Sequence, residues 1–314
     1  MKISIVVPCY NEQESLPLFY GEFCRLCETS EELKDKTFEL IFVDDGSKDS
    51  TFEIMQELSE KDNRVKYISF SRNFGKEAAI YAGLQKADGD LTAVMDADLQ
   101  DPLYLLPQMY KAVAEDGCDS AAARRVTRRG EPPVRSFFAR CFYRLIAKIS
   151  KIELVDGARD YRLMNRKFVS AVLSLKEYNR FSKGIFCWVG FKNKWIEFEN
   201  VERAAGETKW SFWKLTLYAV DAIIAFSTVP LVLATAFGIL LCLLAFLAIM
   251  FVVLRKLIYG DPIQCWASTM CVLLTTGGVQ LLCTGILGQY MAKTYMETKN
   301  RPVYIIDKTN CENR

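Results

Sequence analysis

Apolar and polar positions follow a repeated order along the first third of the chain. Three short apolar runs, at residues 3–7, 38–43 and 91–95, each end in a polar turn. A helical pattern follows the first two turns, around Leu16 and over residues 51–59. Repeated units of strand, turn and helix predict a mainly parallel α/β sheet, and the polar turns of such a sheet share the rim at the carboxyl ends of its strands.

The end of the chain contains two long apolar stretches. No charged residue occurs from Ala222 to Leu254 or from Pro262 to Ala292. About 20 consecutive apolar residues are enough for a helix to cross a bilayer. The sequence therefore predicts two transmembrane helices, at about 229–254 and 266–291.

These spans divide the chain into four predicted parts. Residues 1–210 are expected to form the α/β domain. Residues 211–228 mix aromatic and basic side chains, which is typical of an amphipathic helix lying in the membrane interface, with a buried core helix as the alternative. Residues 229–292 hold both spans, and residues 293–314 are expected to form a tail.

Basic residues near the span ends predict the orientation. They favour both termini in the cytoplasm, because cytoplasmic flanks carry an excess of Lys and Arg. The basic residues are Lys209 and Lys214 before the first span and Lys293, Lys299 and Arg301 after the second, against Arg255 and Lys256 in the connector. No secretory signal is expected, since residues 3–7 are too short an apolar run for one.

Composition limits the chemistry. The 314-residue chain has a net charge of +2 and no histidine, so proton transfer near neutral pH would depend on a carboxylate, Lys, Tyr or Cys. Its 11 cysteines are odd in number and scattered, which argues against a disulfide framework and for a reducing compartment. Cys24 and Cys27 have the spacing of two zinc ligands, but the sequence has no second cysteine pair of this kind and no histidine. A zinc site is therefore not expected.

Asp96 and Asp98 directly follow the third apolar run. Two carboxylates at the mouth of a strand repel each other unless a positive charge lies between them, and hard oxygen ligands suit Mg²⁺ or Mn²⁺. A divalent metal is therefore expected, with a turn whose aspartate caps the next helix as the alternative. Asp44 and Asp45 form a second acidic turn, and no glycine-rich phosphate-binding motif occurs at this rim.

Five segments match motifs of a known enzyme family. They read VVPCYNEQESL (6–16), VDDGSKDST (43–51), SRNFGKEAAIYAGL (71–84), DADLQDP (96–102) and ERAAGETKW (202–210). With these segments the chain resembles the family 2 inverting glycosyltransferases of the GT-A fold. The RNFGKE block at 72–77, the RLMNR block at 162–166 and the paired spans narrow the resemblance to the polyprenyl-phosphate branch. That branch includes bactoprenol glucosyltransferases and, more distantly, dolichyl-phosphate mannose synthases.

The resemblance implies a set of donor-binding residues across the strand rim. Those expected around the uridine of a nucleotide sugar are Pro8, Tyr10, Glu12, Asp44 and Asp45. Those expected near its diphosphate are Lys76, Asp96, Arg203 and Lys209. The metal ligands are expected to be Asp96, Asp98 and Gln100.

The resemblance also implies residues on the acceptor side. Residues 124–144 contain seven arginines and one acid. In the family a mobile basic loop engages the lipid phosphate, whereas a solvated basic face is the alternative. The arginines expected to contact the phosphate are Arg124, Arg128, Arg129 and Arg135.

A second acidic site near the sugar is implied at Asp160. Asp98 and Asp160 are the expected catalytic residues. In relatives that act on sugar hydroxyls the comparable aspartate is a base, whereas a phosphate acceptor already lacks the proton that a base would remove. Asp156 is the competing position, and a surface Asp–Arg ion pair is the alternative reading of this block.

Together these features predict an inverting glycosyltransferase that moves a sugar, with glucose from UDP-glucose as the best fit, onto polyprenyl (undecaprenyl) phosphate at the cytoplasmic face of the inner membrane. GlcNAc, a modified arabinose and mannose are the alternative sugars. The Q-x-x-R-W motif that would support a processive polysaccharide synthase does not occur in this sequence. A membrane scaffold or flippase-like protein would leave the acidic turns unexplained. The expected partners are the bilayer and further copies of the chain through the spans, with no nucleic acid.

Overall fold

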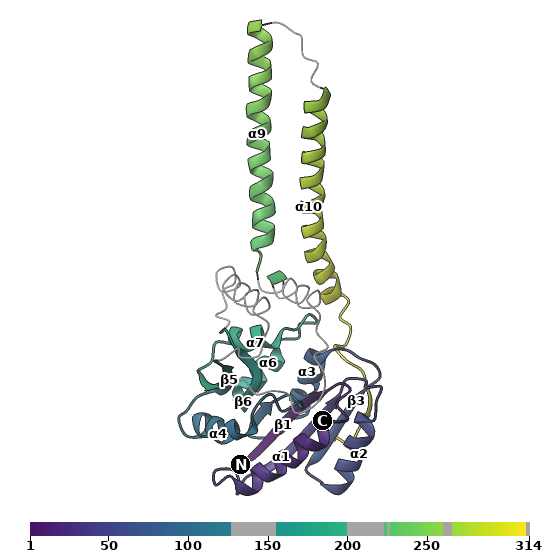
Figure 1. Cartoon of the computed structure of the whole chain (residues 1–314), viewed down its shortest axis with the longest axis vertical. Helices are drawn as coiled ribbons and strands as arrows, with labels where there is room; N and C mark the ends of the chain where they lie inside the picture. Colours follow the sequence, from purple (N-terminus) through teal and green to yellow (C-terminus); the bar gives the residue numbers. More distant parts are fainter. Residues whose placement is uncertain (127–154, 200–222, 225–226, 260–265, 312–314) are drawn as a thin grey trace.

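The computed structural model describes residues 1–126, 155–199, 223–224, 227–259 and 266–311. An α/β domain carries two long helices that extend from it side by side (Figure 1). Its first half consists of β1 (Lys2–Cys9), α1 (Ser15–Thr29), β2 (Thr37–Asp44), α2 (Thr51–Lys61), β3 (Val65–Phe70), α3 (Lys76–Lys86) and β4 (Leu91–Val94). There follow η1 (Leu103–Leu105), α4 (Leu106–Ala114), β5 (Ser120–Arg125), β6 (Ala158–Asn165), α6 (Arg166–Ser174), α7 (Ser182–Trp188) and β7 (Asn193–Phe198). The chain continues through α9 (Val229–Tyr259), α10 (Trp266–Thr298) and β8 (Ile306–Thr309).

The strands form one sheet in the order β7-β5-β6-β4-β1-β2-β3-β8. Strand β1 pairs in parallel with β2 and β4, β2 with β3, and β5 with β7. The predicted mainly parallel α/β sheet is therefore confirmed, and its three apolar runs are β1, β2 and β4. Strand β6 departs from the parallel pattern, because it lies antiparallel between β4 and β5.

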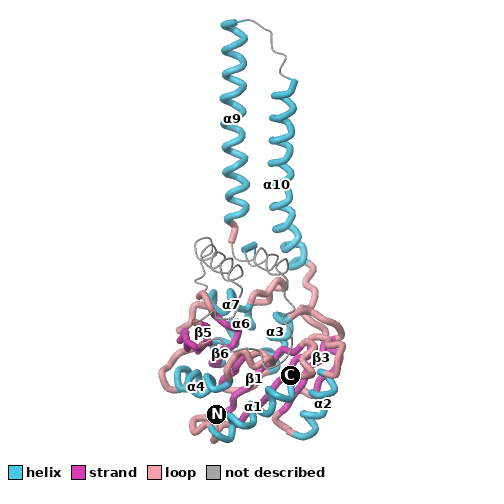
Figure 2. Tube along the Cα trace, viewed as in Figure 1, coloured by secondary structure: helices cyan, strands magenta, loops and turns pink. Residues whose placement is uncertain are grey.

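Helices cover both faces of the sheet. Side chains on one face, such as Ile5 and Phe42, pack with α1, α2 and α4. Those on the other face, such as Val6 and Ile41, pack with α3, α6 and α7, which lie on the side of the domain nearer α9 and α10 (Figure 2). Successive side chains of a strand point to opposite faces, so strands covered on both sides are apolar throughout. Each fully buried Leu, Ile or Phe contributes about 1.5–3 kcal/mol.

Gly83 lets α3 lie directly against β1. A Cβ at this position would lie 2.2 Å from Cγ1 of Val6, so a larger residue would push the helix away from the sheet. Lys76 is the first residue of α3 and follows Gly75, whose φ is +98°. The close packing of α3 therefore determines where Lys76 enters the rim.

Two helices are long and apolar enough to cross a membrane, over Val229–Arg255 and Val272–Thr298. They lie in α9 and α10, at the two predicted spans. Both expose their apolar side chains along most of their length, as lipid-facing helices do. The amphipathic helix expected at 211–228 falls almost entirely outside the described residues.

The expected tail, residues 293–314, is only partly separate from the α/β domain. Helix α10 continues to Thr298, and Ile306–Thr309 then forms β8, antiparallel to β3 at the edge of the sheet. An uncovered sheet edge presents unpaired backbone groups, and β8 covers that of β3. A four-residue strand has too few positions to show a clear alternation, which is why the sequence pattern did not indicate it.

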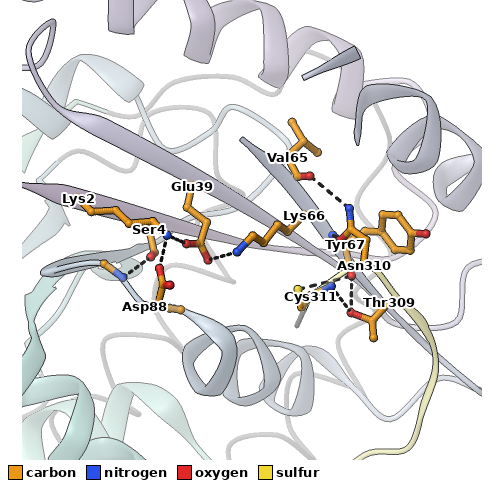
Figure 3. A network of polar contacts seen from close by, with 12 residues as sticks. Lys2, Ser4, Glu39, Val65, Lys66, Tyr67, Asp88, Thr309, Asn310 and Cys311 are labelled. Atoms are coloured by element: carbon orange, nitrogen blue, oxygen red, sulfur yellow. Dashed lines mark hydrogen bonds and ion pairs between the residues drawn. The ribbon is translucent and has the colours of Figure 1, made fainter. Parts of the chain in front are cut away.

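Side chains fasten this last segment to the domain. The ring of Tyr304 stacks on Phe70 with 4.9 Å between centroids, and its hydroxyl donates to Oε1 of Gln85 at 2.6 Å. The side chain of Asn310 accepts a hydrogen bond from the amide of Tyr67 at 2.7 Å (Figure 3). Residues 304–310 are thus held against the α/β domain.

A second polar cluster in Figure 3 joins three strands. Glu39 of β2 is 2% exposed and forms ion pairs with Lys2 of β1 and, at 3.7 Å, with Lys66 of β3. Burial raises the pKa of Glu39, although both lysines oppose the shift. This cluster lies on β-strand residues away from the acidic turns, so its role is structural.

Candidate active site

The loops after β1 and β2 are joined by hydrogen bonds. The amide of Asn11 donates to Oγ of Ser47 at 2.9 Å, and the amide of Lys48 donates to Oδ1 of Asn11 at 2.8 Å. Asn11 itself has a φ of +54°. Pro8, Tyr10 and Glu12, which the sequence predicted to surround a uridine, are half-buried beside the second acidic turn.

Asp44 is buried and stabilises the rim through hydrogen bonds. It is 2% exposed, and its two carboxylate oxygens accept hydrogen bonds from Oγ of Ser69 at 2.7 Å and from the amide of Ser47 at 2.9 Å. Its carboxylate therefore fastens the end of β2 to β3 and shapes its own turn. A direct contact between Asp44 and a base would have to share these oxygens.

Asp45 holds the loop that leads to Lys76. Its carboxylate accepts hydrogen bonds from the amides of Phe74 at 2.7 Å and Gly75 at 2.9 Å. Burial raises the pKa of Asp45 to about 6, although both amides favour the ionised form. Gly46 has a φ of +66° and a Cβ there would lie 2.5 Å from the backbone of Arg72, so the acidic turn packs directly on this loop.

Lys76 lies between two of the predicted site residues. Its ammonium nitrogen is 2.7 Å from Oδ1 of Asp96 and 2.7 Å from Oδ2 of Asp160. The side chains of Asp96 and Asp160 are 24% and 16% exposed, so both pairs are partly shielded from water. A single cation thus offsets two carboxylates that would otherwise repel each other.

The strand register explains how Asp96 and Asp160 come together. Val94 of β4 is paired with Arg162 of the antiparallel β6. In an antiparallel pair, two steps forward on one strand face two steps back on the other. When this register is continued past the end of β4, Asp96 lies opposite Asp160. Lys76, the first residue of α3, contacts both carboxylates.

The charges of this cluster set its protonation states. Burial alone would lower the pKa of Lys76, but Asp160 and Asp96 outweigh it and raise this pKa well above its ordinary value. Burial would raise the pKa of Asp160, but Lys76 and Lys183 hold it below its ordinary value. At neutral pH Lys76 is therefore an ammonium ion and Asp160 a carboxylate.

The loop after β4 is fastened to β6 by a second ion pair. Nε of Arg159 donates to Oδ1 of Asp101 at 2.8 Å, and the Asp101 side chain has no exposure. Arg159 also donates to Oε1 of Gln100 at 3.5 Å. The surface Asp–Arg pair considered for Asp160 is thus wrong: Asp160 pairs with Lys76, and Arg159 pairs with Asp101.

The predicted metal ligands follow β4 on this loop. Oδ1 of Asp98 accepts from the amide of Gln100 at 3.1 Å, and Asp98 is 9% exposed. Among the residues that the structure describes, no group of three or more His, Cys, Asp or Glu side chains is placed to hold a metal ion. Two carboxylates and an amide oxygen are a donor set of the kind that Mg²⁺ and Mn²⁺ prefer, although Lys76 already offsets the charge of Asp96.

Glu77 is a site neighbour that the sequence pattern did not single out. Its Oε2 accepts hydrogen bonds from the amide of Ser182, at 2.8 Å, and from the Ser182 hydroxyl at the start of α7. Burial and the nearby Asp160 raise the pKa of Glu77 to about 7, while Ser182 and Lys76 oppose the shift. Position alone could have suggested it, since Glu77 directly follows Lys76.

The predicted basic residues are only partly visible. Arg124 lies on β5, where it donates to Oε1 of Glu197 at 3.2 Å and to the carbonyl oxygen of Asp156 at 3.2 Å. Apart from Arg124 and Lys76, the basic residues expected to contact phosphate groups lie outside the described residues: Arg128, Arg129, Arg135, Arg203 and Lys209.

Comparison with known proteins shows a family and relatives to which the chain is similar. The model of the family described as Glycosyl transferase family 2 matches residues 4–173. The chain is 42% identical to the putative glycosyltransferase CsbB of Bacillus subtilis, covering 99% of this chain and 93% of the relative. It is 40% identical to the prophage bactoprenol glucosyl transferase homolog of Escherichia coli, covering 98% and 99%.

A solved structure is similar to part of this chain. It is a crystal structure of glucosyl-3-phosphoglycerate synthase from Mycobacterium tuberculosis in complex with Mn²⁺, uridine-diphosphate-glucose and phosphoglyceric acid. The two chains are 19% identical, with a TM-score of 0.47, over 71% of this chain and 77% of the other.

Proposed function

The chain belongs to glycosyl transferase family 2, and from this premise we propose that it moves a sugar from a nucleotide sugar onto a polyprenyl phosphate at a membrane surface. One observation carries the proposal: the similarity to a bactoprenol glucosyl transferase homolog extends over 98% of the chain and so includes both apolar helices. A glycosyltransferase with a soluble acceptor does not need two such apolar helices. Glucose from UDP-glucose is the proposed donor, because relatives named for this activity are glucosyl transferases.

The proposed reaction is a direct displacement. An oxygen of the acceptor phosphate forms a bond to the anomeric carbon, the bond from that carbon to the nucleoside diphosphate breaks, and the configuration inverts. A phosphate monoester has a second pKa near about 6, so the attacking oxygen carries no proton at neutral pH. No general base is required for this step.

Asp160 is then proposed to orient the sugar. Lys76 keeps its carboxylate ionised and holds it 2.7 Å from the ammonium group, so Asp160 can accept hydrogen bonds from sugar hydroxyls but has little affinity for a proton. Lys76 is also positioned to face a diphosphate bound beside Asp96. Pro8, Tyr10 and Glu12 line the proposed nucleotide side of the same rim.

A divalent cation is proposed at the loop after β4. Asp96, Asp98 and Gln100 would hold Mg²⁺ or Mn²⁺ there, and the ion would offset the charge of the departing diphosphate. The acceptor side is proposed to include Arg124 together with Arg128, Arg129 and Arg135. The catalytic domain is proposed to face the cytoplasm at the inner membrane, and copies of the chain to associate through α9 and α10.

The test is a transfer assay with the full chain in detergent. Labelled UDP-glucose and a short polyprenyl phosphate should yield one lipid-linked glucose, and the matching polyprenol without phosphate should yield none. A panel of other nucleotide sugars identifies the preferred donor. No transfer from any sugar would indicate a membrane scaffold, and long products would indicate a polymer synthase.

A further inference from the structure

The C-terminal end of α10 meets the α/β domain (Figure 1). Oε1 of Glu297, in the last turn of α10, accepts hydrogen bonds from the amides of Tyr178 at 3.0 Å and Asn179 at 3.2 Å. Lys293, one turn earlier, donates to Oδ1 of Asn179 at 3.3 Å. Residues four apart lie on the same face of a helix, so one face of α10 holds the loop at 175–181, between α6 and α7.

The position of Glu297 is explained by this contact rather than by the stability of its own helix. It is the single acidic residue in the α10 sequence. An acid in the last turn is unfavourable, because the carboxyl end of a helix carries a partial negative charge. The amides of Tyr178 and Asn179 offset this cost, since a carboxylate accepts stronger hydrogen bonds than a neutral oxygen does.

The loop at 175–181 is also held by α6 and α3. Arg180 of this loop is 9% exposed, and it donates to the carbonyl oxygen of Val172 in α6 at 3.4 Å. Its guanidinium lies 4.2 Å from the ring centroid of Tyr81 in α3, a distance typical of a cation–π contact. The loop is therefore fixed to two helices of the domain as well as to α10.

The same loop leads directly to the proposed reaction centre. Ser182 follows the loop as the first residue of α7, and its amide donates to Oε2 of Glu77 at 2.8 Å. Glu77 directly follows Lys76, whose ammonium group contacts Asp96 and Asp160. A continuous series of contacts thus joins the end of α10 to Lys76.

The segment that follows α10 also contacts α3. The ring of Tyr304 lies 6.4 Å from that of Tyr81 between centroids, and its hydroxyl donates to Oε1 of Gln85 at 2.6 Å. The carbonyl oxygen of Ile305 accepts from the amide of Ser71, at 3.1 Å, where the loop before α3 begins. Two separate attachments therefore fix α3 relative to α10.

We propose that the contact of Glu297 and Lys293 with the loop at 175–181, here called the α10 joint, holds the reaction centre at a fixed place over the bilayer. Glu297 is then a positioning residue for an acceptor embedded in the membrane; this inference rests on the proposed function. The phosphate of such an acceptor stays at the membrane surface, whereas the donor is bound on the domain. Reacting atoms must come within about 3–3.5 Å of each other, and a misplacement of about 1 Å can cost a factor of about 10². A domain displaced on α10 should therefore lose membrane acceptors and keep soluble ones.

The test compares two acceptors with the full chain in lipid vesicles. One is a long polyprenyl phosphate in the bilayer, and the other is a short, water-soluble prenyl phosphate. Glu297→Ala should lower kcat/KM for the long acceptor about tenfold or more, because the reaction centre is misplaced. It should leave unchanged both kcat/KM for the soluble acceptor and the KM for UDP-glucose.

Two further variants accompany Glu297→Ala. Glu297→Gln should keep most of the activity with the long acceptor, because one side-chain oxygen already accepts from both amides. Thr298→Ala is the matched control. Its hydroxyl donates to the carbonyl oxygen of Tyr295 within α10, so its loss should leave transfer to both acceptors unchanged.

Hydrogen exchange measures the α10 joint apart from activity. The amides of Tyr178 and Asn179 should exchange slowly in the unaltered protein and faster in Glu297→Ala, since the variant lacks the oxygens that accept from them. Equal exchange rates in the two proteins would mean that the joint does not form in the bilayer, and this result would overturn the proposal.

The transfer assay can also refute the positioning role. An equal loss with both acceptors would show that Glu297 only maintains the structure of the domain, and no loss with either would show that transfer does not depend on the joint. In both cases the unaltered protein still transfers sugar, so the positioning role alone fails. An unaltered protein that transfers sugar to neither acceptor would instead refute the transferase reaction, and with it the role of Glu297 in that reaction.

Discussion

The ammonium nitrogen of Lys76 lies 2.7 Å from a carboxylate oxygen of Asp160. The two residues are 84 positions apart in the chain and come from a helix on one side of the rim and an antiparallel strand on the other. This pair keeps Asp160 ionised and poorly basic. A carboxylate in this state can accept hydrogen bonds from a sugar but is a poor base for removing a proton. The pair therefore favours an orienting role for Asp160.

Substituting Asp160 should distinguish these roles. Asp160→Asn is expected to reduce turnover by less than the factor of about 10²–10⁴ that the loss of a general base costs. The pH–rate profile at saturating donor should still follow ionisation of the acceptor phosphate. A wild-type acidic limb that disappears in the variant, together with a collapse of the rate, would show instead that Asp160 is the base.

The proposed metal site makes a second prediction. Asp98→Asn should abolish transfer and strongly weaken Mn²⁺ or Mg²⁺ binding, because it removes a charged ligand from the loop after β4. The fold should survive, since Asp98 lies on a rim loop and not in either apolar core. Mn²⁺ binding followed by electron paramagnetic resonance gives a readout apart from activity.

The matched control for this site is Asp116→Asn. Asp116 is an exposed aspartate paired with Lys194 at 2.8 Å, and its loss should leave both transfer and metal binding intact. A folded Asp98→Asn protein with a near-normal rate would contradict the assignment.

The raised pKa of Glu77 makes the third prediction, on stability. Its folded-state pKa of about 7 lies above the ordinary 4.5, so the protonated form is favoured in the folded protein. The contribution to stability is therefore full below about pH 4.5 and is lost as the pH rises through about 7. Glu77→Gln should remove this slope and gain on the order of 1 kcal/mol relative to the unaltered protein at about pH 8.

Thermal unfolding in detergent at a series of pH values measures this difference. Glu53→Gln is the control, because Glu53 lies in the first turn of α2 on a different helix. Parallel curves for Glu77→Gln and the unaltered protein between about pH 5 and pH 8 would show that Glu77 titrates normally in the folded state.

The fourth prediction concerns membrane topology and uses the pairing of β8 with β3. Because residues 306–309 belong to the sheet, a reporter after Arg314 should lie on the same side of the membrane as one before Met1. A reporter inserted near Gly260, between α9 and α10, should lie on the opposite side. Protease protection in sealed vesicles reads both positions, and a Gly260 reporter on the side of the termini would mean that α9 and α10 do not both cross the bilayer.

Local patterns in the sequence determined much of this protein. The apolar runs at β1, β2 and β4, their polar turns and the two long apolar stretches each show a periodicity or a length that depends only on neighbouring residues. The motif residues around Asp44 and Asp96 could be found for the same reason. Their shared rim follows from the parallel α/β arrangement that those units predict.

Only the tertiary structure decided which of these residues meet. Asp160 reaches Asp96 and Lys76 because β6 runs antiparallel to β4 in one particular register, and a shift of one residue would turn Asp160 to the other face. Arg162 lies among three aromatic rings only because α6, α7 and β7 bring Phe168, Phe186 and Trp195 around it. Register, burial and charge pairing depend on contacts between distant segments, and no local pattern of side chains encodes them.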